Sequence, residues 1–132
     1  MRTIKFKGKR LMSEDWEYGN LIQRPCGGHF IETGDMRLCP IQDLSVGQFT
    51  GLHDRNGNEI YEGDIIRSFD SQGEPIIHVI EYDNNDAKFI VILSGYTKYD
   101  FGCGGINQKW INEFGKEVIG NIHDNPELLK QK

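Results

Sequence analysis

The spacing of turn residues between short apolar runs most limits the possible fold. The segment Asp54-Arg55-Asn56-Gly57-Asn58 separates two apolar runs, and Asn-Gly supplies the positive φ angles that a tight hairpin turn demands. Sixteen glycines, single or paired, separate such runs along the chain. This pattern favours a turn-rich β protein over a helical one.

The apolar runs have the composition of β-strands. Residues 4–9 alternate, with Ile4 and Phe6 on one face and lysines on the other, which predicts a half-buried strand. Later runs are rich in β-branched and aromatic residues, which strands prefer; they cover 65–69, 76–82, 88–93 and 117–122. One helix signal stands at the end, with Asn125 as N-cap and Pro126 at the first helical position.

The order of these elements predicts a mainly β protein. We expect an N-terminal β segment over residues 1–46, then a small SH3-like barrel over residues 47–132 with a short C-terminal helix. One compact unit containing both parts is the alternative.

Charge and hydropathy limit the setting of the protein. The net charge of −5 argues against a protein that coats nucleic acid, because phosphate binding needs a surplus of Lys and Arg. No window approaches the roughly 20 apolar residues of a membrane span. Three cysteines without a secretory signal predict reduced thiols and a cytoplasmic location.

Two kinds of chemistry have candidate residues. Cys26 and His29 have a spacing that could grip zinc on a Gly-rich turn, and Cys39 and Cys103 would complete a tetrahedron. A second short-spaced pair is missing, so we expect no metal and no cofactor. The familiar nucleophile, phosphate-loop and metalloprotease motifs are also missing, so the sequence favours a non-enzymatic protein.

Basic residues at the N-terminus provide a nucleic-acid hypothesis. Lys5, Lys7 and Lys9 would project from one strand face near Arg10, and aromatic residues elsewhere could stack bases. The alternative is a solvated basic strand, and the overall acidity favours it.

Three segments resemble the YopX-like family of phage and prophage proteins. They are residues 49–66, 79–83 and 117–129, and the Ile4-Lys5-Phe6 start and Trp16-Glu17-Tyr18-Gly19 also fit. The resemblance implies an accessory protein of a bacterial host's phage or prophage, with no assigned activity and no catalytic residues to carry across.

Partner binding is therefore the favoured function class, either to a second copy of the chain in a homo-oligomer or to an unidentified phage or host protein. Tyr61, Glu62 and Asp64 form a candidate binding turn, although the same residues would also serve turn geometry. The poorly periodic stretch 94–114 adds Tyr96, Tyr99 and Trp110, residue types that are enriched at interfaces.

Overall fold

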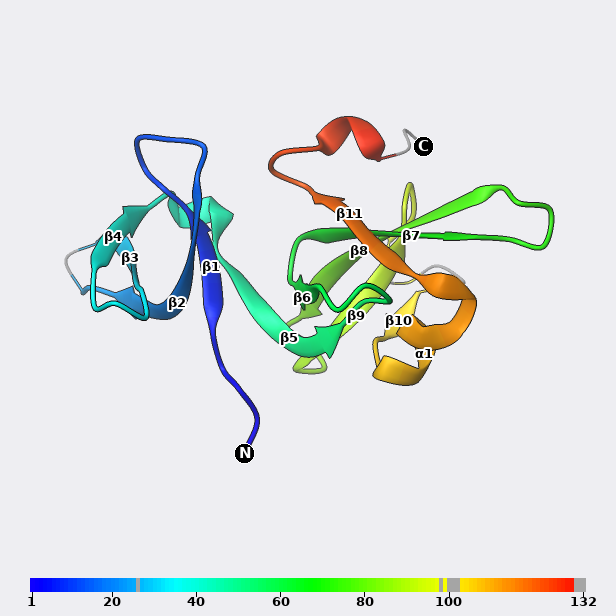
Figure 1. Cartoon of the computed structure of the whole chain (residues 1–132), viewed down its shortest axis with the longest axis horizontal. Helices are drawn as coiled ribbons and strands as arrows, with labels where there is room; N and C mark the ends of the chain where they lie inside the picture. The colour runs from blue at the N-terminus through cyan, green and yellow to red at the C-terminus, as the bar shows by residue number, and fades with distance from the viewer. Residues whose placement is uncertain (26, 98, 100–102, 130–132) are drawn as a thin grey trace. The chain divides into compact units, whose positions relative to one another are not determined.

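The computed structural model describes residues 1–25, 27–97, 99 and 103–129. The chain forms two compact units, Met1–Gly51 and Leu52–Lys132, which we describe separately (Figure 1). The prediction of a mainly β protein is confirmed, because two antiparallel sheets hold most of the regular structure. The SH3-like barrel and the domain boundary between residues 46 and 47 stay predictions.

The first unit is a meander of short antiparallel strands. Its sheet has the order β4-β3-β2-β1-β5. The elements are β1 (Phe6–Lys9), β2 (Trp16–Gln23), β3 (His29–Glu32), β4 (Leu38–Ile41), a 3-10 helix (Asp43–Ser45) and the start of β5 (Gly47–His53).

This sheet curls so that the end of β1 contacts β4. The backbone N–H of Leu11 donates to the carbonyl of Pro40 (3.1 Å), and the N–H of Gln42 donates to the carbonyl of Lys9 (2.8 Å). A methyl group at Gly8 would collide with the side chain of Ile41, so the close approach requires glycine there. The outer edge of β4 is thereby partly covered.

The strand predicted over residues 4–9 is confirmed at Phe6–Lys9, but the prediction that its lysines project into solvent was wrong for Lys7 and Lys9. Lys7 and Lys9 are buried, at 5% and 7% exposure, whereas Ile4 is 53% exposed. The ammonium of Lys7 lies 4.7 Å from the ring centroid of Trp16, and Lys9 forms an ion pair of 2.6 Å with Glu14. The Trp16 ring and the Glu14 carboxylate stabilise these two buried ammonium groups. The alternation of apolar and basic residues in the sequence does not by itself predict such contacts.

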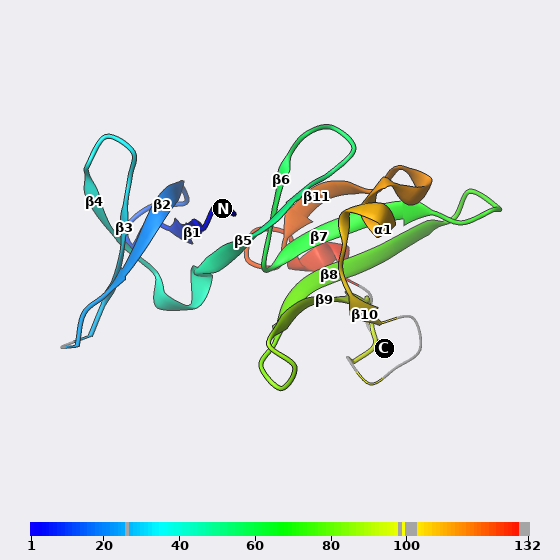
Figure 2. The same ribbon diagram turned by 90° about the horizontal axis from the view of Figure 1, so that it is seen from below.

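The second unit is built on a five-stranded antiparallel sheet of order β10-β9-β8-β7-β11 (Figure 2). The end of β5 leads into β6 (Glu59–Tyr61), its neighbour. The sheet strands are β7 (Asp64–Phe69), β8 (Pro75–Asp83), β9 (Lys88–Leu93), β10 (Gly104–Gly105) and β11 (Glu117–Asn121); α1 (Gln108–Asn112) and 3-10 helices at Glu113–Gly115 and Pro126–Leu128 complete the unit.

One face of this sheet carries the core. Its buried residues come from β6, β7, β8, β9 and α1 and are Ile60, Ile66, Ile80, Val91 and Ile111. The α1 helix falls in the poorly periodic stretch 94–114; the side chain of Asn107 caps it by accepting from the N–H of Trp110 (2.8 Å).

The predicted turns are confirmed, and the C-terminal helix is shorter than expected. Gly57 and Gly63 have φ angles of 83° and 91°. The helix is a single 3-10 turn, and Asn125 makes no side-chain cap. Its Oδ1 instead accepts from the N–H of Asn121 (3.3 Å), so this side chain holds β11 rather than the helix.

Candidate functional site

The strongest candidate site is an apolar groove on the sheet face opposite the core. Successive side chains of a strand point to opposite faces, so His78 and Ile80 of β8 share the core face and Val79 and Glu81 face the other way. Val79 and Ile92, at 9% and 8% exposure, line a groove of about 330 Å³ on that second face.

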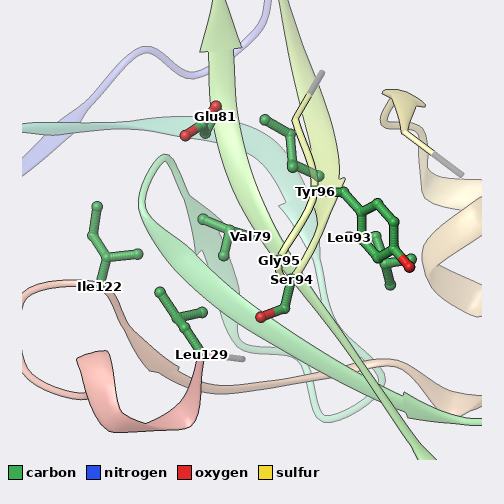
Figure 3. Close-up of a pocket in the computed structure, with 9 residues that line it drawn as sticks. Val79, Glu81, Leu93, Ser94, Gly95, Tyr96, Ile122 and Leu129 are labelled. Carbon is green, nitrogen blue, oxygen red and sulfur yellow. The ribbon is translucent and has the colours of Figure 1, made fainter. Parts of the chain in front are cut away.

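The two sides of the groove come from segments that are distant in sequence. The turn after β9 places Ser94, Gly95 and Tyr96 on one side, and the C-terminal segment places Ile122 and Leu129 on the other. Figure 3 shows Val79 between Ile122 and Tyr96. Tyr96 and Ile122 are 48% and 37% exposed, so the rim is accessible while the floor is buried.

Gly63, from the segment 49–66 that resembles the YopX-like family, positions the C-terminal side of the groove. The N–H of Gly63 donates to the carbonyl of Ile80 (2.8 Å), and the carbonyl of Gly63 accepts from the N–H of Ile122 (2.9 Å). The Oδ1 of Asn121 then accepts from the N–H groups of His123 and Asp124, each at 2.9 Å. The Gly63 turn and the Asn121 turn therefore hold Ile122 beside β8.

The groove carries a negative charge at Glu81. Among the described residues that line it, Glu81 carries the one carboxylate, and it is exposed. An apolar concavity next to a carboxylate suits an apolar side chain that has a basic neighbour. The arrangement therefore has the chemistry of a docking site for a protein segment.

The residues of the predicted binding turn at 61–64 are largely buried. Tyr61 and Asp64 are each 3% exposed. The N–H of Tyr61 donates to Asp64 Oδ2 (2.8 Å), and the Tyr61 hydroxyl donates to Glu59 (2.9 Å). Glu62 is half-buried. These side chains stabilise the turn, and a binding role for them stays a prediction.

The three aromatic candidates do not gather in one site. Tyr96 lines the groove, and Tyr99 is 81% exposed. Trp110 lies on α1, whose neighbour Ile111 packs in the core on the other face of the sheet, and its ring meets that of His78 edge-on at 5.0 Å. The predicted interface over 94–114 includes residues 98 and 100–102, which lie outside the described part.

The basic candidates are only partly accessible. Lys7 and Lys9 are buried as described above, and Lys5 lies 5.3 Å from the ring centroid of Phe49. Arg10 is half-buried beside Glu17. These contacts occupy the charges that a phosphate backbone would require, so no observation favours nucleic-acid binding, which stays a prediction.

The candidate zinc ligands have other contacts. His29 Nδ1 lies 2.8 Å from Asp43 Oδ1, and its Nε2 lies 3.1 Å from the side-chain amide of Gln23. Cys39 is buried in the first unit, and Cys103 of the second unit accepts from the N–H of Leu93 (3.3 Å). Cys26 lies outside the described residues, among which no group of three or more metal ligands gathers.

Comparisons with known proteins add a family and a fold. A family model described as YopX protein matches residues 4–130. The crystal structure of protein EF1440 from Enterococcus faecalis is similar, with a TM-score of 0.58 and 22% identity, covering 98% of this chain and 100% of that chain. No curated protein matches. In the described part of the chain, no helix is long and apolar enough to cross a membrane.

Proposed function

The chain belongs to the YopX protein family, and from this premise we propose that it is a non-enzymatic protein-interaction module serving as a phage or prophage accessory protein. The observation that carries the proposal is the groove on the second unit, with Val79 and Ile92 at its floor and Glu81 at its margin. The groove accepts an apolar side chain of a partner protein, and Glu81 pairs with a Lys or Arg beside it.

At the β11 edge of this unit, side-chain docking is better supported than strand addition. The edge strand β11 has backbone donors that other strands could use. The N–H of Val118 already donates to Asp54 Oδ2 (2.9 Å), and that of Asn121 donates to Asn125 Oδ1 (3.3 Å). Because side chains occupy these donors, the edge is protected from pairing with another chain.

Selection of peptides from a random display library on the immobilised full chain tests the proposal. We expect enriched peptides to share an apolar residue next to Lys or Arg. Tyr96→Ala should weaken them about tenfold, as loss of an aromatic contact at an interface does. Glu81→Lys should abolish the basic preference.

Glu74→Lys is the matched control, because it reverses an exposed charge in the turn between β7 and β8, away from the groove. This variant should bind as the wild type does. Peptides without a shared pattern, or a pattern that Tyr96→Ala and Glu81→Lys both leave intact, would refute the proposal.

Self-association is a second mode, and exposed apolar residues of the first unit favour it. Met12, Met36 and Leu44 are 91%, 85% and 91% exposed. We propose that each contributes an apolar contact to a homo-oligomer, since exposed apolar side chains lose contact with water when a second copy covers them. Native mass spectrometry should show an oligomer that the Leu44→Ser and Met36→Ser changes weaken; a wild-type monomer would contradict this mode.

A further inference from the structure

A second cavity of about 300 Å³ lies at the end of the core face of the second unit. Its inner wall contains His78 of β8, Trp110 of α1 and Lys116, and its rim contains Phe69 and Phe114. His78 and Lys116 are 8% and 4% exposed, whereas Phe114 is 78% exposed. The cavity thus combines buried polar groups with an accessible aromatic rim, as small-molecule sites do.

Lys116 is a buried cation whose pKa burial lowers, and the nearby Glu113 carboxylate offsets that effect only in part. Its Nζ donates to the carbonyl of Glu113 (2.8 Å) and lies 4.3 Å from the ring centroid of Trp110 and 5.5 Å from that of Phe114. Among the described residues it forms no ion pair. Buried charges are normally paired, so an anion that forms an ion pair with Lys116 suits this site.

His78 provides a second, independent sign of a ligand. Its Nδ1 is buried and has no hydrogen-bond partner in the described part of the chain. Burial, with a smaller effect of the Lys116 charge, lowers the pKa of His78 to about 4. The ring is therefore neutral at neutral pH and keeps an N–H donor. A buried polar atom without a partner is destabilising, and a ligand atom relieves that.

The rim residue Phe114 is held in an unfavourable backbone conformation. Its φ and ψ angles are 58° and 24°, a left-handed conformation that bulky residues rarely adopt. A large apolar side chain on a strained backbone contributes little to the stability of the fold when it is also exposed. Such strain concentrates at ligand sites.

We propose that this cavity binds a carboxylate carried on an aromatic ring. The Lys116 ammonium pairs with the carboxylate, His78 donates a hydrogen bond, and Phe69, Trp110 and Phe114 pack against the ring. Asp70 and Glu113 also line the cavity, but both are exposed, so the high dielectric constant of water weakens their repulsion of the carboxylate. The site is separate from the docking groove and does not depend on it.

Titration of the full chain followed by NMR tests the proposal. The indole N–H signals of Trp110 and Trp16 serve as reporter and internal control, because Trp16 belongs to the first unit. Phenylacetate and N-acetylphenylalanine are the charged probes, and their amides are the uncharged controls. We expect the charged probes to shift the Trp110 signal and the amides to do so at least about tenfold more weakly, as befits a charge-assisted contact.

Which charged probe binds identifies the source of the carboxylate: phenylacetate stands for a small metabolite, and N-acetylphenylalanine for the C-terminus of a peptide. Binding of either one supports the site. Equal binding of acids and amides, or no Trp110 shift with any probe, would overturn the proposal.

Two variants separate binding from folding. Lys116→Met keeps an apolar stem and should weaken the charged probes about tenfold or more, whereas Lys109→Met, an exposed change on α1, should not. Phe114→Gly should weaken binding while raising thermal stability, because glycine adopts positive φ without strain. Unchanged affinity in both Lys116→Met and Phe114→Gly would refute the assignment.

Discussion

The carboxylate of Asp54 accepts a hydrogen bond from the backbone N–H of Val118, 2.9 Å away and 64 residues along the chain. It also accepts from the N–H groups of Asn56 and Asn58, each at 2.9 Å. Burial raises the pKa of Asp54, but these hydrogen bonds outweigh it and hold that pKa below its ordinary value. One ionised side chain thus joins the hairpin turn to the closing strand β11.

We expect Asp54→Ala to lower the free energy of unfolding by about 3 kcal/mol, because it leaves several backbone donors without a partner in a half-buried setting. Asp70→Ala is the matched control: Asp70 Oδ1 accepts from Gln72 and Glu74 in the same way, but on an exposed turn. That change should cost about 1 kcal/mol or less. Urea unfolding measures both, and equal effects would contradict the role given to Asp54.

Residue 120 must be glycine because the side chain of Asn125 leaves no room for a β-carbon there. A β-carbon at Gly120 would lie 2.7 Å from Asn125 Cγ, closer than real contacts allow. Gly120→Ala should therefore destabilise the protein by about 1–3 kcal/mol, as overpacking does. Gly104→Ala, with open space around it, should be nearly neutral.

A double mutant tests that explanation. In the Asn125→Ala background the contacts with Oδ1 and Cγ are gone and only the tight contact with Cβ, at 3.1 Å, remains, so Gly120→Ala should cost clearly less there than in the wild type. If the two costs are equal, crowding by Asn125 is not the reason for glycine.

These contacts explain why the sequence predicted so much of the second unit. Asp54, Gly57, Gly63 and Gly120 act through turns and close approaches, which are local and leave clear signals in sequence. The resemblance to the YopX-like family rested on the same segments. Its motifs therefore describe the fold, which is why they identified the family without indicating a chemical activity.

The candidate site was not predictable in the same way. Val79, Ile122 and Leu129 meet only because strands and the C-terminal turn bring them together, and each alone resembles an ordinary core residue. Tyr96 was predicted from composition, but its neighbours were not. The helix α1 was missed because its five residues are held by Asn107 and by packing of Ile111, and short helices have weak sequence signals.

The buried lysines of β1 provide a test that separates stability from nucleic-acid binding. Lys7→Glu should destabilise the first unit by about 2–4 kcal/mol, because it places a carboxylate against the electron-rich face of the Trp16 ring at a buried position. Lys5→Glu, at a half-buried position, should cost less. Near-UV circular dichroism during urea unfolding measures both changes.

The same variants address the nucleic-acid hypothesis. If the basic strand binds DNA, Lys5→Glu and Arg10→Glu should lose retention on DNA at low salt while remaining folded. We expect retention to be weak in the wild type and unchanged in these variants. A clear loss in folded Lys5→Glu would restore the hypothesis.

His78 should make the stability of the second unit depend on pH. Its pKa is about 4 in the folded protein and 6.5 in the unfolded chain, so between these values the unfolded state binds a proton that the folded state does not. Stability is therefore full above pH 6.5 and falls as the pH drops toward 4. The charged groups around the ring are Lys116, Glu113 and Asp70, and Lys116 adds to the effect by opposing protonation.

We expect this contribution to be on the order of 2 kcal/mol, measured as the difference in unfolding free energy between pH 7 and pH 5 in urea. His78→Gln cannot titrate and should remove most of that difference, although it changes stability at pH 7 as well. His53→Gln replaces an exposed histidine and should leave the pH dependence as it is. An equal pH dependence in His78→Gln and the wild type would show that the carboxylates, rather than this ring, govern acid unfolding.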